Sequence, residues 1–369
     1  MKHDHRRTER QRLVAKTLLL ILLSTQSAVQ AQDDQGLPTE SIHFESIHSE
    51  SVHSGSIRSE SIPTEAIRIR DPYILADSLT RRYYLYAQMD NRRWGQEDTA
   101  QFQGVEVYVS TDLKHWESPQ PVLILSDTAW ARERVWAPEV HAYRDKFYLL
   151  VTLTGSDTLP PPASFNPSPG WPPLRERGTQ IFVSDSPRGP FEPFANRPHT
   201  PEDWMALDGT LYEEGGDPFM IFCHEWVQTQ DGSIVYVQLT EDLSGTVGPP
   251  QTMFHASEAP WVTEQGRKVT DGCFLYRTKT GKLLMIWSSN RENGYAIGIA
   301  ASETGTLAGP WTQQEELLFA QNGGHGMIFK TFDQRLMLVF HQPNKPKGRE
   351  RLKLFEIKDT GRSLVLSRS

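Results

Sequence analysis

Five short polar or acidic motifs recur along the chain, and each runs directly into a pair of expected strands. The motifs are Arg70-Asp71-Pro72-Tyr73-Ile74, Trp136-Ala137-Pro138-Glu139-Val140, Ala206-Leu207-Asp208-Gly209-Thr210, Val269-Thr270-Asp271-Gly272-Cys273 and Gly324-His325-Gly326-Met327-Ile328. Counted from Asp71 to Glu139, Asp208, Asp271 and His325, the steps are 68, 69, 63 and 54 residues. A near-regular period of this size, filled with strands, is typical of a β-propeller with one blade per repeat. The sequence therefore predicts an all-β fold, a five-bladed β-propeller with four-stranded antiparallel blades around a central channel.

The same repeat predicts where the chemistry lies. In a propeller, the residues that open the innermost strands all face one mouth of the central channel. Four carboxylates and one histidine from distant parts of the chain are therefore expected around a single cavity. The strands that follow the motifs account for residues 67–369, which leaves no room for a second folded domain.

The first 66 residues have a different composition. Six Lys and Arg residues precede an apolar stretch centred on 17–23, and Val29-Gln30-Ala31 is suited to cleavage, so we interpret 1–31 as a secretory signal peptide. A membrane anchor is the weaker interpretation, because the apolar run is shorter than the ~20 residues that a spanning helix needs. We interpret 32–66 as a disordered low-complexity linker, because residues 37–66 carry a degenerate five-residue repeat with about one apolar residue in five. The predicted location is periplasmic or extracellular.

The charge balance limits the partners of the mature chain. Without 1–31, 32 basic and 44 acidic residues remain, a net charge of −12. Such a balance argues against nucleic acid or an anionic membrane as partner. Ten Trp and eleven Tyr are consistent with binding to the C–H faces of sugars, although a large β core also uses many aromatic residues. We expect a monomer that binds an oligo- or polysaccharide and does not insert into a membrane after signal cleavage.

Two cysteines remain, Cys223 and Cys273, and each falls inside an expected strand. An exported protein permits a disulfide between them, but two buried free thiols are the preferred interpretation.

Two carboxylates have surroundings that suit proton transfer. Asp71 lies between Arg70, which would keep it ionised, and a proline that forces an extended backbone, so we predict that Asp71 is a general base. Glu258 is followed by Ala259-Pro260-Trp261, an apolar setting that would keep a carboxyl protonated, so it is predicted to be the general acid. An exposed loop Glu is the alternative for this residue.

Two further motif residues have less specific predictions. Asp208 could raise the pKa of the acid, or it could simply cap its strand. His325, between two glycines, could hold a metal ion or water at the channel centre, or cap its strand. We also expect four side chains to contact the substrate, namely Trp136, Glu139, Trp261 and Arg291.

With these motifs in order, the chain resembles glycoside hydrolase family 43, whose members are arabinan- and xylan-trimming enzymes with five-bladed propellers. Arg70-Asp71-Pro72 is similar to the family's general-base motif, and Trp136-Ala137-Pro138-Glu139 to its second-blade motif. Leu207-Asp208-Gly209-Thr210-Leu211 resembles the motif of the pKa-modulating Asp. Ser257-Glu258-Ala259-Pro260 resembles the general-acid motif Glu-Gly-Pro, with Ala in place of Gly. Gly324-His325-Gly326 is similar to the stretch whose His coordinates a central calcium in many members.

The resemblance implies an inverting glycosidase acting on plant-cell-wall pentose glycans, with Ca²⁺ in the channel and no organic cofactor. We favour an exo-acting α-L-arabinofuranosidase, because loops 155–178 and 91–103 could close one end of a cleft. β-Xylosidase and endo-1,5-α-L-arabinanase share the motifs and stay open. A non-catalytic carbohydrate-binding propeller is disfavoured because all three carboxylates are present. A retaining fructan hydrolase is disfavoured because Arg70 precedes Asp71 where such enzymes have Asn-Asp-Pro.

Overall fold

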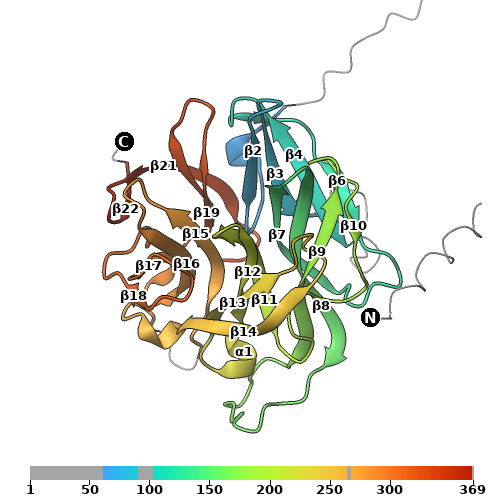
Figure 1. Cartoon of the computed structure of the whole chain (residues 1–369), viewed down its shortest axis with the longest axis vertical. Helices are drawn as coiled ribbons and strands as arrows, with labels where there is room; N and C mark the ends of the chain where they lie inside the picture. Colours follow the sequence, from blue (N-terminus) through green and yellow to red (C-terminus); the bar gives the residue numbers. More distant parts are fainter. Residues whose placement is uncertain (1–60, 90–102, 264–266, 368–369) are drawn as a thin grey trace, which may run out of the picture. The chain divides into compact units, whose positions relative to one another are not determined.

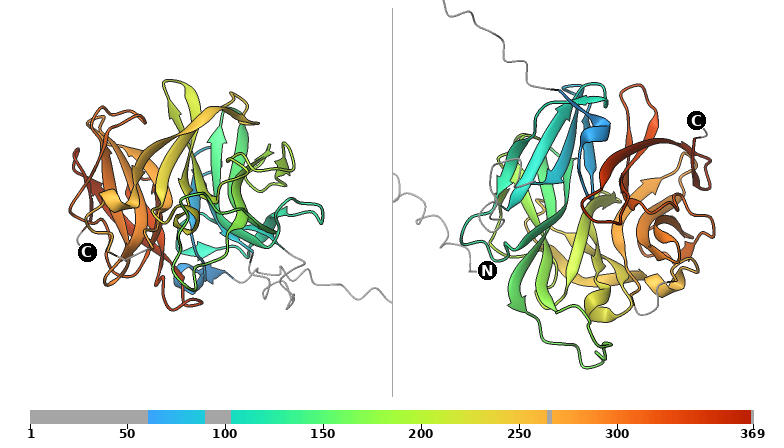
Figure 2. Two further views of the ribbon diagram at one scale, coloured as in Figure 1. Left: turned by 90° about the horizontal axis from the view of Figure 1, so that it is seen from below. Right: turned by 180° about the vertical axis from the view of Figure 1, so that it is seen from behind.

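The computed structural model describes residues 61–89, 103–263 and 267–367, and it confirms the predicted five-bladed β-propeller (Figure 1). Five four-stranded antiparallel sheets follow one another in chain order around a ring, and each sheet is one blade. Figure 2 shows the same blades from below and from behind. The predicted signal peptide, most of the predicted linker and nearly all of loop 91–103 lie outside the described residues.

The strand bounds follow the predicted blade order. Blade one contains β2 (Tyr73–Asp77), β3 (Arg82–Gln88), β4 (Gly104–Ser110) and β6 (Gln120–Ile124). Blade two contains β7 (Arg134–Tyr143), β8 (Lys146–Thr158), β9 (Arg175–Ser184) and β10 (Glu192–Pro193). Blade three contains β11 (Ala206–Glu214), β12 (Asp217–His224), β13 (Ser233–Leu239) and β14 (Thr246–His255). Blade four contains β15 (Asp271–Arg277), β16 (Leu283–Arg291), β17 (Gly294–Ser302) and β18 (Trp311–Gln313). Blade five contains β19 (Gly324–Lys330), β20 (Leu336–Gln342), β21 (Arg351–Asp359) and β22 (Leu364–Leu366).

The core lies between adjacent blades, which explains why the second strands are apolar on both faces. Leu149 and Leu150 of β8 are both fully buried, although consecutive strand residues point to opposite faces. The same holds for Ile286 and Trp287 of β16. Each such side chain stabilises the fold by ~1.5–3 kcal/mol. A continuous apolar run therefore marks the strand that is covered by a neighbouring blade on each side.

The inner strands of four blades start with the same β-bulge. The pairing register skips between Trp136 and Glu139, Leu207 and Thr210, Asp271 and Phe274, and Gly324 and Met327. The first bulged residue has a positive φ in each case: Ala137 (44°), Asp208 (57°), Gly272 (55°) and His325 (54°). Asp71 (47°) takes the same conformation immediately before β2, so the prediction that Pro72 forces an extended backbone at Asp71 is wrong. A non-glycine residue there costs ~1–3 kcal/mol, and such strain concentrates at functional sites.

These five residues correct the register that the sequence suggested. The structural equivalents of Asp71 are Ala137 and Gly272 in blades two and four, rather than Glu139 and Asp271. Glu139 lies two residues further along its strand, and Asp271 lies one residue before its bulge. The motif alone could not show this, because several of its residues tolerate the left-handed conformation.

Side chains from the preceding blade hold the strained residues. The backbone N–H of Asp71 donates to Nδ1 of His341 on β20 at 3.2 Å. The N–H of Asp208 donates to Oγ1 of Thr152 on β8 at 2.8 Å, and that of His325 to Oγ of Ser288 on β16 at 2.8 Å. Each bond joins two blades at the mouth of the channel, so the bulges are fixed by the ring itself.

The N-terminal boundary of the propeller differs from the prediction. The sequence assigns residues 61–66 to the disordered linker, but β1 (Ile62–Pro63) pairs with β5 (His115–Trp116), and η1 (Thr64–Ala66) follows. Oγ1 of Thr64 donates to the carbonyl of Leu113 and accepts from Nε1 of Trp116. A two-residue strand has no periodicity that a sequence could reveal, and Trp116 lies 52 residues beyond Thr64.

We therefore expect a chain starting at Glu65 to lose stability relative to one starting at Ser61, because it lacks β1 and Thr64. The lost bonds leave the buried indole N–H of Trp116 without its acceptor, which costs ~1–3 kcal/mol. Melting temperatures of the two chains and of one starting at Gln32 test this. Equal melting temperatures for all three chains would show that residues 61–66 do not stabilise the propeller and belong to the linker.

Two smaller findings complete the fold. Cys223 and Cys273 are buried free thiols, as predicted. Within the part of the chain that the structure describes, no helix is long and apolar enough to span a membrane. The longest described helix, α1 (Trp226–Thr229), has only four residues.

Candidate active site

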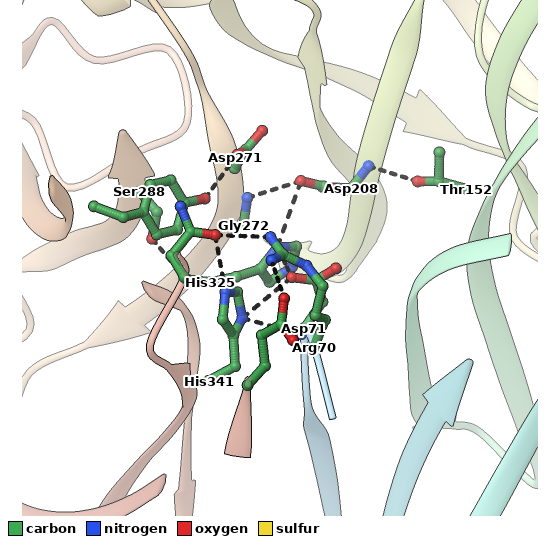
Figure 3. A network of polar contacts seen from close by, with 12 residues as sticks. Arg70, Asp71, Thr152, Asp208, Asp271, Gly272, Ser288, His325 and His341 are labelled. Carbon is green, nitrogen blue, oxygen red and sulfur yellow. Dashed lines mark hydrogen bonds and ion pairs between the residues drawn. The ribbon is translucent and has the colours of Figure 1, made fainter. Parts of the chain in front are cut away.

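Residues from four blades meet at one mouth of the channel (Figure 3). Nδ1 of His325 lies 3.2 Å from Oδ1 of Asp71 and 3.7 Å from Oδ2 of Asp208. Oδ2 of Asp208 also accepts the backbone N–H of Gly272 at 3.0 Å, and Oδ2 of Asp271 accepts the hydroxyl of Tyr295 at 2.7 Å. The structure thus brings together three of the predicted residues, Asp71, Asp208 and His325, and adds Asp271.

Asp71 is held in its ionised form. Burial alone would raise its pKa, but His325, Arg70 and His341 outweigh burial and hold the pKa of Asp71 well below its usual range. Burial likewise opposes the charge on His325, yet Asp71 and Asp208 raise the pKa of that imidazole to about 10. Arg70 is itself fixed by Glu350 at 3.0 Å and by Asn344 at 2.9 Å. This agrees with the prediction that Arg70 favours an Asp71 carboxylate.

The other two carboxyls have the opposite tendency. Burial is the main reason that the pKa of Asp208 is raised, and the nearby Asp271 and Asp71 add to it. Burial also raises the pKa of Asp271, with a further contribution from Asp71, although the hydrogen bond from Tyr295 opposes the rise. Three neighbouring carboxyls therefore share the site, one kept charged and two inclined to keep a proton.

Glu258, the predicted acid, lies outside the hydrogen-bonded cluster of Asp71, Asp208 and His325. It is exposed at the end of η2 (Ala256–Glu258), where Oε1 accepts the backbone N–H of His255 at 2.7 Å. Among the described residues, no hydrogen bond or ion pair joins Glu258 to Asp71, Asp208 or Asp271. Its role as the acid stays a prediction, and no direct bond to Asp71 is expected of it, because the acid and base of an inverting enzyme stand about 6.5–9.5 Å apart.

Trp136 is half-buried next to a charged pair. The guanidinium of Arg177 lies 4.5 Å from the centre of its ring, and that of Arg134 lies 5.8 Å from it. Arg177 is buried, bonds Oγ1 of Thr154 and forms an ion pair with buried Glu225. Burial raises the pKa of Glu225, while Arg177 opposes the rise. The ring of Trp136 is thereby fixed beside the mouth.

Replacing Glu225 by Ala is expected to destabilise the protein by ~3–5 kcal/mol, because it leaves the buried Arg177 charge without its partner. Chemical denaturation measures the loss. Glu241→Ala is the matched control, since Glu241 pairs with Arg144 on the exposed surface, where ion pairs contribute little. Equal effects of the two substitutions would contradict the expectation.

The remaining predicted contact residues are not in the cluster. Glu139 is buried further along the inner strand, with Oε2 at 2.9 Å from Nε2 of His141. Nδ1 of that imidazole lies 3.2 Å from the hydroxyl of Tyr73. Trp261 packs its ring against Trp287 at 4.7 Å between centres. Trp261 and Arg291 both line one cavity of about 580 Å³. Among the described residues, neither side chain is hydrogen-bonded to Asp71.

Calcium has no evident site among these side chains. The described residues contain no group of three or more His, Cys, Asp or Glu side chains that could hold a metal ion. Nδ1 of His325 faces two carboxylates, whereas a hard cation prefers oxygen ligands. Among the described residues, the side chains in this arrangement therefore offer no ready-made site for the ion.

Calcium in the channel stays a prediction that chelation tests. If an ion is held through water and His325, its removal by exhaustive dialysis against a chelator should lower both the melting temperature and the activity. Added Ca²⁺ should then restore both. If neither quantity moves, the protein has no functional calcium.

Sequence reasoning missed His341 and Tyr295. His341 lies inside β20 and Tyr295 inside β17, so each resembles an ordinary strand residue. Asp271 was singled out by its motif but received no role. The signal that could have found it is the similarity of Thr270-Asp271-Gly272 to Leu207-Asp208-Gly209, in which an Asp-Gly pair opens the inner strand.

Comparisons with known proteins identify the family of the chain. A model of "Glycosyl hydrolases family 43" matches residues 61–368, and no curated protein matches the chain. The chain is 38% identical to an endo-arabinase from Bacteroides thetaiotaomicron VPI-5482, with a TM-score of 0.69 over 81% of this chain and 97% of that one. Two more distant structures share the fold. An endo-1,4-beta-xylanase from the same source is 21% identical, with a TM-score of 0.63 over 84% of this chain and 97% of that one. An alpha-L-arabinofuranosidase from Lactobacillus brevis is 18% identical, with a TM-score of 0.62 over 82% of this chain and 94% of that one. The chain is a glycoside hydrolase and belongs to glycosyl hydrolase family 43.

Proposed function

We propose that the protein hydrolyses pentose glycosides of arabinan or xylan with inversion at the anomeric carbon. The observation that carries this is the opposite pKa shifts of neighbouring carboxyls, Asp71 downward and Asp208 and Asp271 upward. Groups whose surroundings push their pKa values apart are suited to act as base and acid in one reaction. Asp71 takes a proton from water as the water attacks the anomeric carbon, and an acid protonates the departing oxygen.

Two residues compete for the role of the acid. Asp271 is favoured by its place in the cluster, its raised pKa and its Tyr295 contact, which orients the carboxyl. Glu258 is favoured by the motif around it. Asp208 then tunes the acid, because it is the most buried of the three cluster carboxyls and the protonation of neighbouring carboxyls is coupled.

For the substrate we propose α-L-arabinofuranosyl linkages. A relative that is 38% identical to this chain is described as an endo-arabinase, and this similarity favours internal cleavage of arabinan. Exo action, which the loop lengths suggested, is supported by the loop after β8: Trp171 packs on Trp226, and its Nε1 donates to the carbonyl of Val227 at 2.7 Å. This loop is thus fixed against blade three as a wall. β-Xylosidase activity is the remaining alternative.

A panel of aryl pentosides and linear arabino- and xylo-oligosaccharides separates these activities by product length. Proton NMR of the first-formed sugar tests the mechanism, and we expect the inverted anomer. A retained anomer would contradict the inverting mechanism, and binding without any turnover would leave a carbohydrate-binding propeller.

We also propose that the protein is exported, on the basis of the basic and apolar segments in 1–31, and that the mature form is a monomer. N-terminal sequencing of the secreted protein and light scattering test the two statements.

A further inference from the structure

A cavity of about 520 Å³ lies beside the carboxylate centre, between blades one, two and five. Two of its lining residues give its position: Arg70 directly precedes Asp71, and Trp136 directly precedes the bulge residue Ala137. A cavity of this volume is in the range of small-molecule sites. It is therefore placed to hold a part of the substrate next to the point of cleavage.

The lining carries an excess of positive charge. The basic side chains are Arg68, Arg70, Arg134 and Lys347, and the acidic ones are Glu133 and Glu350. Arg70 and Glu350 neutralise each other in an ion pair. Within the described residues, Arg68 and Lys347 have no hydrogen-bond or ion-pair partner, and the guanidinium of Arg134 contacts only the ring of Trp136. In a chain with a net charge of −8, such a concentration of unpaired cations is not explained by composition.

Apolar groups share the same cavity. Ile69, Met89, Val135 and the ring of Trp136 line it alongside the cations. Aromatic and aliphatic surfaces suit the C–H face of a sugar, while guanidinium groups suit a carboxylate, which they can bind through two parallel hydrogen bonds. A sugar that carries a carboxylate satisfies both features.

We propose that this cavity is a subsite for a uronic acid, so that the enzyme selects glycans with a carboxylate next to the linkage it cleaves. The inference rests on the proposed glycoside hydrolase function. The ionised Asp71 repels a second anion at the cleaved sugar itself, so the uronic acid occupies the neighbouring position, in the cavity that Arg70 and Glu350 line.

The test compares each acidic glycan with its own neutral form. Oligosaccharides of glucuronic-acid-bearing arabinoxylan and of galacturonic-acid-bearing pectic arabinan are each used before and after reduction of their carboxyl groups to primary alcohols. We expect kcat/KM to favour the acidic form about five- to tenfold in at least one pair, up to about 1.4 kcal/mol. The preference should shrink in high salt, because the cations are exposed. The pair that shows it identifies the source of the uronic acid.

Variants link the preference to the cavity. Arg134→Gln, and Arg68→Gln combined with Lys347→Gln, should bring the ratio toward one. The control is Lys330→Gln combined with Lys358→Gln, which removes two exposed lysines of blade five that do not line the cavity. Equal melting temperatures show that the variants are folded. A ratio of one for both pairs in the unmodified enzyme, or an unchanged ratio in the cavity variants, would overturn the subsite.

Calorimetric binding separates this inference from the proposed function. The ratio of affinities for acidic and reduced oligosaccharides does not require turnover. If no glycan is hydrolysed but the affinity ratio exceeds one and falls in the cavity variants, the subsite stands and the proposed reaction does not. An affinity ratio of one overturns the subsite whether or not hydrolysis occurs.

Discussion

The Asp71→Asn variant is expected to lose activity by a factor of about 10² to 10⁴ on every substrate, whatever its leaving group. The amide has nearly the same shape as the carboxyl but cannot take a proton from the attacking water. The loss should appear in kcat on nitrophenyl pentosides and on oligosaccharides alike. Because water attack is needed in both reactions, no improvement of the leaving group rescues the variant.

Controls for this variant exclude unfolding and a general effect of removing a carboxylate. Asp71 pairs with His325 at 3.2 Å, so the melting temperature of the variant must be measured. Asp145→Asn is the matched substitution in an exposed turn of blade two, and it should keep the full rate. If the Asp71→Asn protein is folded and its rate is within tenfold of the normal rate, Asp71 is not the base.

The Asp271→Asn and Glu258→Gln variants are expected to differ in their rates. The difference should depend on whether the departing group of the substrate needs a proton. An enzyme without its acid still cleaves nitrophenyl glycosides, because nitrophenolate departs without a proton. The same enzyme loses a factor of about 10² to 10⁴ on oligosaccharides, whose departing oxygen must be protonated. We expect this selective loss for Asp271→Asn, since Asp271 lies in the cluster and has a raised pKa.

The outcome of that comparison assigns the acid either way. The amide oxygen introduced by Asp271→Asn can still accept the hydrogen bond from Tyr295, so the variant should fold. Glu258→Gln keeps an oxygen that can accept the N–H of His255, and it should have near-normal rates on both substrates. A selective loss in Glu258→Gln, with Asp271→Asn unaffected, would make Glu258 the acid.

Particular residues show why part of the site was predictable. Asp71, Asp208 and His325 were predicted from motifs that open the inner strands, and ring closure places all inner-strand starts at one mouth. Glu139 opens a similar motif but lies with His141 and Tyr73 instead. The difference is a β-bulge, because a shift of one or two residues along a strand changes the face or the depth at which a side chain lies.

Other contacts had no local signal. His341 bonds the backbone of Asp71 across a separation of 270 residues, and Arg177 meets Glu225 across 48. Such pairs depend on which blades are neighbours and on how their strands are aligned. Neither strand propensity nor a motif contains that information.

The sequence by itself determined the number of blades, their strands and the presence of a base motif, because each depends on local hydrophobic pattern, turn residues and spacing. Only the tertiary structure decided which motif residue takes the left-handed conformation, which carboxyls come together in one cluster and in which direction the pKa of each is shifted. Those properties arise from burial and from charges brought within a few ångströms by closure of the ring, and neither exists until the blades have packed.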